Sequence, residues 1–290
     1  MKTLIQNYTS SISTEPMYIE RCLQECGEES QIWANPQLSA FDAFDSFNPD
    51  LFITHYSFLT SDIIKYLSNK QSITVALNIT GITEADLQKL EELSQGVNLP
   101  LLFTNLFETN SVVSKKIKTI SLYPAADIFL PTIPTPEFSI QKCIISVTEN
   151  DMYEEKLKGV ETYHKFSFNA ESLGADMALD IASMRSFYPK YDEVLIADDV
   201  SFVTSQVLFD GILNAKKVSL QVPESQQETL DKILAELFVS NDDQDDKDIS
   251  EVIKSQVKIK HNCFKRCARL FRSLKAEDVA SKMEVISSKL

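Results

Sequence analysis

Three polar side chains that could bind or activate a substrate occur at regular intervals in the first half of the chain. His55, Asn78 and Asn105 each follow an apolar run of four or five residues. If these runs are parallel strands, their carboxyl ends meet at one edge of a sheet, where open α/β folds bind ligands. Imidazole titrates near neutrality, so His55 is the candidate general base for an acceptor hydroxyl. Asn78 and Asn105 could orient that acceptor, although a histidine satisfied by neighbouring backbone explains His55 equally well.

A second candidate is the acidic pair that ends the apolar run Val194–Ala197. Asp198 and Asp199 could hold Mg²⁺ or accept a phosphoryl group, as the acidic pocket of a receiver domain does. The alternative is structural, because an acidic residue at this place caps the following helix and matches its dipole. The structural interpretation is favoured.

The spacing of the cysteines permits a metal site but does not favour one. Cys22 and Cys26 are separated by three residues, and His261 precedes Cys263 and Cys267. Zinc sites use similar pairs. Cys22 and Cys26 also lie on the apolar face of an expected helix, where cysteine packs as a small hydrophobic residue. We therefore predict no metal site.

The stretch Tyr191–Leu220 carries the clearest strand–helix–strand pattern in the chain. Val194–Ala197 suits a buried strand, Val200–Ile212 places its apolar residues at helical spacing, and Lys217–Leu220 suits the next parallel strand. Similar alternation occurs on both sides of this stretch. It is typical of parallel sheets covered by helices, so we predict an α/β fold with two Rossmann-like parallel-sheet domains and a C-terminal helical segment.

Further elements follow from the same periodicities. Strands are expected at 3–7, 32–34, 51–54, 73–77, 101–104, 143–147 and 163–168. Helices are expected at 15–26, 41–47, 61–67, from Thr83, and at 152–158, 175–186 and 226–238. His164 falls within an expected strand and is interpreted as structural.

Three prolines in residues 131–136 indicate a stiff extended linker between the two domains. We therefore expect domains at 1–133 and 134–257, followed by a helical tail at 258–290.

The last fifth of the chain changes charge from acidic to basic. Residues 241–248, NDDQDDKD, carry five aspartates and little to bury, which predicts a solvated loop. In the basic helix expected over 258–275, Lys265, Arg269 and Arg272 share one face. That face is either solvated while the helix docks through its apolar side, or it binds phosphate or the acidic loop.

Composition excludes several classes of protein. The chain of 290 residues has only 6 glycines and contains neither GxGxxG nor GxxxxGK[ST], which argues against the Gly-rich phosphate loops. A net charge of −14 makes nucleic acid an unexpected partner. Five scattered cysteines do not form a disulfide framework, and no run of about 18 apolar residues occurs. We expect a soluble, cytoplasmic, acidic protein with no transmembrane segment.

Two α/β domains in tandem with a helical tail resemble a GT-B glycosyltransferase. More narrowly, the chain resembles the spore-maturation-protein-B-like (CgeB-type) family. Three stretches carry this resemblance: Glu15–Tyr18, Phe47–Ile53 and His261–Arg266. The last is similar to the His-Thr-Tyr-x-x-Arg pattern of that family. The resemblance spans most of the chain and makes 1–133 the acceptor side and 134–257 the donor side.

In the resembled family, a helix segment of the second domain grips the phosphate and ribose of a nucleotide-sugar. The nearest stretch here is Ser205–Gly211. The resemblance implies that Ser205, Gln206 and Asp210 bind the donor and that Asp210 accepts hydrogen bonds from the ribose. Gln206 stands where the family has arginine, so a cation for the pyrophosphate is missing.

The missing cation matters because a diphosphate leaving group needs charge stabilisation as the glycosidic bond breaks. The first strand of the second domain also ends in Thr148–Asn150, where the family tends to have glycine and a nearby arginine. Arg266 and Lys156 are the candidates to replace the absent charge.

The leading hypothesis is a glycosyltransferase-like protein that moves a sugar from a nucleotide-sugar to a glycan or small-molecule acceptor in an interdomain cleft. The donor would be a cosubstrate, no tightly bound cofactor is expected, and dependence on Mg²⁺ stays open. The alternative is a non-catalytic GT-B-fold protein that binds a nucleotide, a glycan or a protein. Scarce glycine and Gln206 favour the alternative, whereas His55 and the two-domain layout favour the enzyme. A regulatory module that uses Asp198 or Asp199 is a third hypothesis.

Overall fold

The computed structural model describes residues 1–8, 13–33, 39–107, 112–130, 140–146, 157–167, 177–178, 184–238 and 246–290. The chain divides into two compact units. The first unit comprises Met1–Thr9, Glu15–Tyr123 and Cys263–Lys289, and the second comprises Ser10–Thr14, Pro124–Asn262 and Leu290. The chain therefore leaves the first unit, forms the second and returns.

A sheet of six parallel strands, in the order β2-β1-β3-β4-β5-β6, forms the centre of the first unit. The strands are β1 (Lys2–Gln6), β2 (Glu29–Trp33), β3 (Leu51–His55), β4 (Thr74–Asn78), β5 (Leu101–Asn105) and β6 (Lys118–Leu122). The chain moves from β1 outward to β2 and then crosses to β3 on the other side. The direction of winding reverses between β1 and β3, and open α/β sheets bind ligands at such a switch point.

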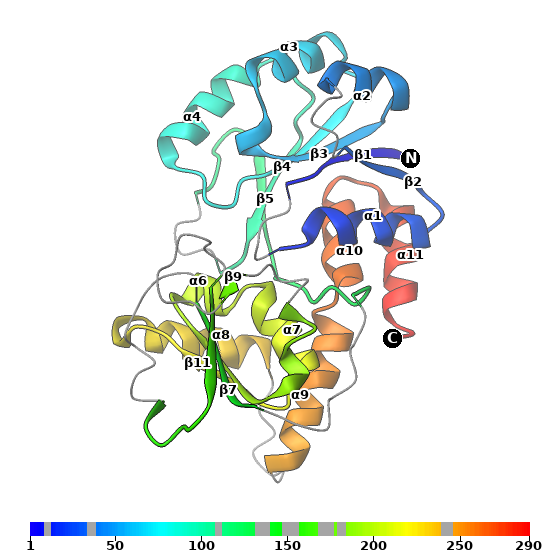
Figure 1. Cartoon of the computed structure of the whole chain (residues 1–290). Helices are drawn as coiled ribbons and strands as arrows, with labels where there is room; N and C mark the ends of the chain where they lie inside the picture. Colours follow the sequence, from blue (N-terminus) through cyan, green and yellow to red (C-terminus); the bar gives the residue numbers. More distant parts are fainter. Residues whose placement is uncertain are drawn as a thin grey trace. The chain divides into compact units, whose positions relative to one another are not determined.

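Helices cover both faces of this sheet (Figure 1). They are α1 (Glu15–Glu25), α2 (Ala40–Phe47), α3 (Ser61–Asn69), α4 (Glu84–Leu93), α10 (Cys263–Ser273) and α11 (Glu277–Ser287), with the 3₁₀ helix η1 (Tyr56–Phe58). Ser39, Thr60 and Thr83 cap α2, α3 and α4 by accepting a backbone N–H. α2, α3 and α4 lie on one face, and α1 and α10 pack together on the other.

Apolar side chains from the sheet and from α2, α3 and α4 form the core on one face. Phe44 and Phe52 meet edge to face with their ring centroids 4.8 Å apart. Leu4, Val75, Leu77 and Leu102 from the strands, with Ile63, Leu67, Leu87 and Leu90 from the helices, belong to the same buried cluster. The short apolar runs of the sequence become strands because both of their faces are buried in this way.

The second unit also contains a parallel sheet, in the order β11-β10-β7-β8-β9. Its strands are β7 (Ile140–Ser146), β8 (Tyr163–Ser167), β9 (Met177–Ala178), β10 (Tyr191–Ala197) and β11 (Val218–Gln221). β7 lies between β8 and β10, so the winding reverses between β7 and β10. The predicted α/β fold with two parallel sheets and a helical C-terminal segment is confirmed.

The described helices of the second unit follow β10 and β11. They are α6 (Val200–Val203), α7 (Gln206–Asn214), α8 (Gln227–Leu237) and α9 (Asp246–Lys260), with the 3₁₀ helices η3 (Tyr188–Lys190) and η4 (Glu224–Gln226). α7 packs closely on the sheet at Gly211, where an added Cβ would lie 3.5 Å from Val218 Cγ2 and 3.7 Å from Ile196 Cδ1.

Several expected helices differ from the structure. The helix expected over 175–186 is wrong at Met177–Ala178, because these residues pair with β8 as strand β9. The single helix expected over 200–212 is two helices, since α6 ends at Val203 and the Ser205 side chain caps the start of α7. α9 begins at Asp246, within the stretch expected to be a loop. The basic helix expected over 258–275 is interrupted between α9 and α10.

The expected domain boundaries can be placed only in part. The proline-rich linker and the helix expected at 152–158 lie largely outside the described residues. Cys263–Lys289 cluster with the first unit, whose main segment ends at Tyr123. The division into 1–133, 134–257 and 258–290 stays a prediction. Within the described part of the chain, no helix is long and apolar enough to cross a membrane.

Candidate functional site

The carboxyl edge of the first sheet carries the three polar residues singled out from the sequence. His55 is the last residue of β3 and pairs in register with Asn78, the last residue of β4. Asn105 is the last residue of β5. At the switch point, Thr54 Oγ1 donates a hydrogen bond of 2.8 Å to Gln6 Oε1 at the end of β1. The structure therefore brings the three residues to one edge, while their roles stay predictions.

Both ring nitrogens of His55 have close partners. Nε2 lies 3.0 Å from the Thr80 carbonyl oxygen, and Nδ1 lies 2.7 Å from Ser57 Oγ. A carbonyl oxygen only accepts, so Nε2 carries the hydrogen, and Nδ1 accepts from the Ser57 backbone N–H at 3.3 Å. Burial lowers the pKa of His55, against the opposing effects of the Thr80 carbonyl and Glu15. The imidazole is therefore neutral at pH 7, with its acceptor nitrogen facing a serine hydroxyl.

Asn78 fixes the turn that follows β4. It is 5% exposed, and its Oδ1 accepts a hydrogen bond of 2.9 Å from the Thr80 backbone N–H. The same turn supplies the carbonyl that orients His55. Asn78 also forms a side-chain hydrogen bond with Tyr8, whose pKa is raised well above its ordinary value by burial and by Glu15. Asn78 thus positions the backbone around His55.

Arg266 of α10 lies in a buried ion pair with Glu15 at the start of α1. Its Nη2 is 2.9 Å from Glu15 Oε2 and 3.3 Å from Asn105 Oδ1, and its Nη1 donates to the Tyr123 carbonyl. Arg266 is 6% exposed and Glu15 is 5% exposed. Burial disfavours the charged guanidinium, but Glu15 and the nearby tyrosines outweigh this and raise the pKa of Arg266. Its phosphate-binding role stays a prediction, and that role requires these contacts to rearrange.

The donor-binding residues implied by the resemblance lie at the start and middle of α7. Ser205 caps the helix, and Gln206 exchanges two hydrogen bonds with Thr14, from its Nε2 to Thr14 Oγ1 at 2.9 Å and from the Thr14 N–H to its Oε1 at 3.0 Å. Gln206 Nε2 also lies 3.2 Å from Asp210 Oδ2. Thr14 Oγ1 donates to Asp127 Oδ2 at 2.8 Å. These side chains already form a buried network.

Asp210 is fully buried at the centre of this network. Arg185 Nη2 donates to its Oδ1 at 3.0 Å, and the Arg185 side chain is 4% exposed. Burial raises the pKa of Asp210 to about 7, and nearby Asp127 adds to this effect, against the opposing influence of Arg185 and Gln206. A direct bond from ribose to Asp210 would require the Arg185 pair to open.

Sequence reasoning missed Arg185, a cation that contacts Asp210 on α7. Lys156, the other candidate, lies outside the described residues. Arg185 falls in a stretch expected to be an ordinary helix, and no neighbouring motif marked it. The one available signal was its position a few residues before the central strand β10.

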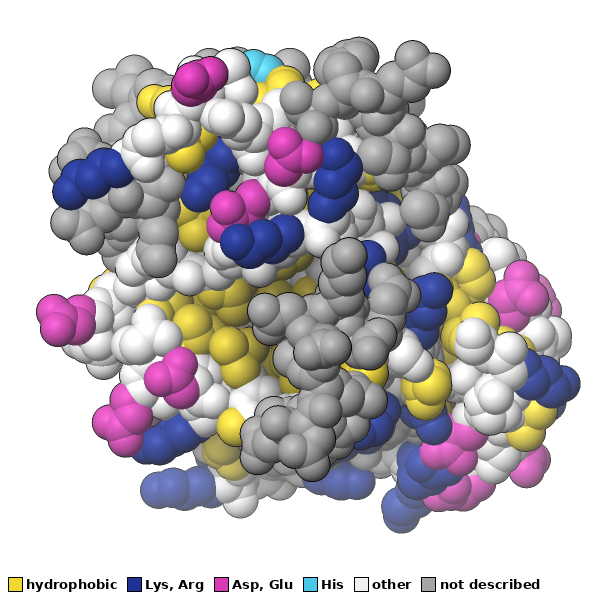
Figure 2. All heavy atoms as spheres, turned by 90° about the horizontal axis from the view of Figure 1, so that it is seen from below, with side chains coloured by type: hydrophobic (Ala, Val, Ile, Leu, Met, Phe, Trp, Pro, Cys, Tyr) yellow, Lys and Arg dark blue, Asp and Glu magenta, His cyan; other side chains and the backbone are white. Residues whose placement is uncertain are grey.

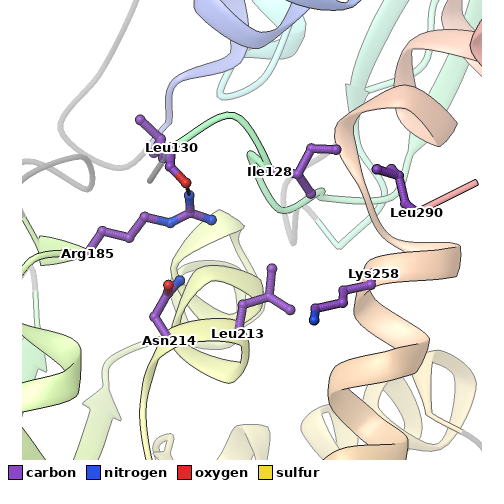
Figure 3. A pocket seen from close by; sticks show the side chains of 7 residues that line it. All are labelled: Ile128, Leu130, Arg185, Leu213, Asn214, Lys258 and Leu290. Carbon is purple, nitrogen blue, oxygen red and sulfur yellow. Dashed lines mark hydrogen bonds between the residues drawn. The ribbon is translucent and has the colours of Figure 1, made fainter. Parts of the chain in front are cut away.

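A cavity of about 310 Å³ lies beside Arg185 in the second unit (Figure 3). Its polar lining consists of Arg185, Asn214 at the end of α7 and Lys258 in the last turn of α9. Its apolar lining includes Ile128, Leu130 and Leu213. In Figure 3 the Arg185 guanidinium and the Lys258 ammonium extend from opposite sides toward the space around Leu213.

The acidic pair after β10 has local structural partners. Asp199 caps α6 by accepting the Phe202 N–H at 2.9 Å, and Asp198 Oδ1 accepts the Asp199 N–H at 2.8 Å. Asp198 is 4% exposed. These bonds agree with the structural interpretation of the pair.

The cysteines are buried free thiols. Burial raises the pKa of Cys22 well above its ordinary value, and hydrogen bonds with Cys263 and Cys267 add to the effect. Among the residues that the structure describes, no group of three or more His, Cys, Asp or Glu side chains could hold a metal ion.

On the basic face of α10, Arg272 lies 2.8 Å from Glu284 in α11, and Arg269 lies over the Tyr123 ring at 5.6 Å. Two of the three cations of this face thus make contacts within the first unit.

No protein-family model and no curated protein sequence matches this chain. Three solved structures with a similar backbone fold are a glycosyltransferase, a UDP-GlcNAc 2-epimerase and a protein solved with UDP. The glycosyltransferase of kitacinnamycin is 12% identical, with 100% of this chain and 98% of that chain covered and a TM-score of 0.40. The UDP-GlcNAc 2-epimerase from Methanocaldococcus jannaschii is 11% identical, with 95% and 99% covered and a TM-score of 0.44. The S. aureus protein MnaA with UDP is 11% identical, with 95% of each chain covered and a TM-score of 0.49. At such identities and TM-scores the likeness carries no argument about substrate or reaction.

Proposed function

We propose that this protein is glycosyltransferase-like: it binds a nucleotide-sugar and transfers the sugar to a hydroxyl of a glycan or small-molecule acceptor. The supporting observation is the presence of two parallel sheets, each with a switch point next to polar residues. His55 stands beside the first switch point. At the second, the buried Ser146 hydroxyl at the end of β7 has no hydrogen-bond partner among the described residues, and Asp198 follows β10. Open α/β sheets bind ligands at this edge.

His55 is the proposed general base for the acceptor. Its Nδ1 is the nitrogen that can take a proton, because Nε2–H is held by the Thr80 carbonyl. The acceptor hydroxyl would pass its proton to Nδ1 either directly or through the Ser57 hydroxyl that now faces it. A lowered pKa keeps the imidazole unprotonated at neutral pH, as a base requires. Asn78 and Asn105 would position the acceptor and the turn.

Ser205, Gln206 and Asp210 remain the proposed donor-binding residues, with Arg266 as a proposed phosphate cation. The nucleotide-sugar is a cosubstrate in this scheme. Binding would need Gln206 and Asp210 to exchange bonds with Thr14 and Arg185 for bonds with the ligand.

The alternative proposal is a non-catalytic protein of the same fold that binds a nucleotide, a glycan or a protein. A specific observation favours it. Gln206 and Asp210, which are 6% and 0% exposed, already satisfy each other and their neighbours. A helix whose polar side chains are engaged in this way can hold the fold together without contacting a donor.

Thermal shift with UDP, GDP, TDP and CMP sugars, with and without Mg²⁺, tests binding. A ligand that binds only the folded protein raises its apparent stability by an amount that grows with concentration. We expect one nucleotide class to raise the melting temperature. If no nucleotide-sugar does so, both the donor and the nucleotide-binding proposals fail.

The role of His55 is tested by His55→Gln, with His164→Gln as the matched control. His164 is an exposed histidine of the second unit whose Nδ1 lies 2.9 Å from the Tyr191 hydroxyl. For a general base we expect transfer to fall by about 10²- to 10⁴-fold in His55→Gln while the ligand-induced shift is retained. Equal turnover in both variants would exclude His55 as the base. Binding without transfer in the unaltered protein would support the non-catalytic alternative.

A further inference from the structure

A serine hydroxyl faces the acceptor nitrogen of His55. Ser57 Oγ lies 2.7 Å from His55 Nδ1, and Ser57 is exposed to solvent. Because Nε2 carries the hydrogen that it donates to the Thr80 carbonyl, Nδ1 is the acceptor and the Ser57 hydroxyl is the donor of this bond. A base that accepts the proton of a serine hydroxyl makes its oxygen a better nucleophile.

Helix capping does not account for this contact. His55 precedes η1, and its Nδ1 caps that helix by accepting the Ser57 backbone N–H at 3.3 Å. The capping bond needs no hydroxyl at residue 57, because any residue other than proline supplies the N–H. The hydroxyl is the closer of the two donors, so the shorter bond is the one that the serine side chain adds.

The turn that follows β4 orients the imidazole. His55 Nε2 lies 3.0 Å from the Thr80 carbonyl oxygen, and Asn78 Oδ1 accepts the Thr80 N–H at 2.9 Å. The Tyr56 hydroxyl donates to the Gly81 carbonyl of the same turn at 3.3 Å. A nucleophile, a base and a group that orients the base form the arrangement of serine hydrolases. Here a backbone carbonyl takes the third place, where those enzymes commonly have a carboxylate.

Aromatic side chains lie beside His55 and Ser57. The ring centroids of Tyr56 and Tyr8 are 4.5 and 6.1 Å from that of His55. Phe58 follows Ser57 in η1 and is 41% exposed. These rings offer apolar surface to the acyl group or the leaving group of a substrate.

The charge of the chain indicates a neutral substrate. A net charge of −14 disfavours the approach of an anion. Figure 2 shows Lys and Arg side chains intermixed with Asp and Glu side chains over the described part of the face seen there. Because Ser57 is exposed, a small molecule can reach it directly from solvent. A small neutral ester therefore fits these surroundings best.

We propose that Ser57 is a nucleophile, activated by His55, that hydrolyses small neutral carboxylic esters. Ser57 Oγ attacks the carbonyl carbon while its proton passes to His55 Nδ1. The bond from that carbon to the alcohol oxygen then breaks, and the leaving alcohol takes the proton from Nδ1. Water attacks the acyl-serine and gives a proton to Nδ1, the bond to Ser57 Oγ breaks, and Oγ takes this proton back. The products are an alcohol and a carboxylic acid, and the inference does not depend on whether the protein transfers a sugar.

Two measurements test the proposal. Hydrolysis of p-nitrophenyl acetate, followed by release of p-nitrophenol, reports turnover, and a fluorophosphonate probe located by mass spectrometry reports the nucleophile. The variants are Ser57→Ala and His55→Gln. The matched control is Ser61→Ala, which changes an exposed serine at the start of α3. We expect the probe to label Ser57, and turnover to fall by about 10²- to 10⁴-fold in both variants and to stay unchanged in Ser61→Ala.

Equal ester turnover in Ser57→Ala and Ser61→Ala would overturn the proposal, as would equal probe labelling of the two serines. Because an accessible histidine can also cleave an activated ester, His164→Gln is a second control, and an equal loss in His164→Gln and His55→Gln would contradict the role of His55. If circular dichroism shows that His55→Gln does not fold, Ser57→Ala decides, since residue 57 is exposed. The assay contains no nucleotide-sugar, so failure of the transferase proposal and failure of this one are measured separately.

Discussion

Replacing Asp210 with asparagine tests whether its buried carboxyl titrates near neutrality. Folding raises the pKa of Asp210 from an ordinary value of 3.8 to about 7. Each tenfold change in proton affinity corresponds to about 1.4 kcal/mol, so ionising this carboxyl costs the folded state about 4 kcal/mol relative to the unfolded chain. The folded state holds the proton more tightly than the unfolded state does. The stabilising contribution of the protonated form is therefore complete below about pH 4 and is lost as pH rises to about 7.

The assay is urea unfolding followed by far-UV circular dichroism from pH 4 to pH 8. Other carboxyls also titrate in this range, so the difference between the unaltered protein and Asp210→Asn isolates the residue. We expect that difference to change by up to about 4 kcal/mol between pH 4 and pH 8, because asparagine cannot ionise. Asp231→Asn, an exposed carboxylate on α8, should leave the pH profile unchanged. The tryptophan, Trp33, lies in β2, so its fluorescence follows the first unit separately.

Parallel stability profiles for Asp210→Asn and the unaltered protein would refute this reasoning. A direct check is the ¹³C resonance of the Asp210 carboxyl, assigned by its absence from the variant. Titration of that resonance near pH 4 would mean that Arg185 stabilises the charged carboxylate more than burial and Asp127 oppose it.

Further substitutions test single contacts. Arg266→Met removes the guanidinium from the buried Glu15 carboxylate and should destabilise the first unit by about 3–5 kcal/mol, measured by Trp33 fluorescence in urea. A loss below about 1 kcal/mol would show that the ion pair is dispensable. Gly211→Ala should be neutral or stabilise by up to about 1 kcal/mol, because the added Cβ makes ordinary contacts in a helix interior. Gly27→Ala should destabilise by about 1 kcal/mol because φ there is +74°, and the opposite order of these two glycine variants in melting temperature would contradict the backbone geometry. The buried cysteines should react with iodoacetamide at pH 8 only after unfolding, and rapid labelling of the native protein would show that they are accessible.

The apolar runs and capping residues of the sequence predicted most of the first sheet and its helices. The strands are buried on both faces, so they appear as apolar runs, and the helices begin at clear capping residues. The run ending at His55 and the helix after Thr83 are examples. β6 was missed because its residues are half-exposed on an edge strand and give no apolar run. The break at Ser205 was missed because the apolar spacing continues across it, whereas the hydroxyl that caps α7 is a single-residue signal.

The polar edge of the first sheet could be predicted because residues at strand ends converge by topology. The network around Asp210 could not, because Thr14 and Gln206 are 192 residues apart in the chain and meet only through the fold. The role of Arg185 could not be predicted for the same reason, because its buried carboxyl partner, Asp210, is identified only from the folded structure. Arg266 was predicted to bind the phosphate of a ligand. Its position in the sequence does not indicate that it forms an ion pair with Glu15, 251 residues away.

Because α10 belongs to the first unit, that unit can be completed only after α10 has been synthesised. The ribosome makes Glu15 early and Arg266 251 residues later, after the main segment of the second unit, Pro124–Asn262. At roughly 5–20 residues per second, roughly 10–50 seconds pass between the synthesis of Glu15 and that of Arg266. During that interval the N-terminal half of the chain carries a carboxylate that is buried in the folded protein, so this half reaches its final form only once α10 has left the ribosome.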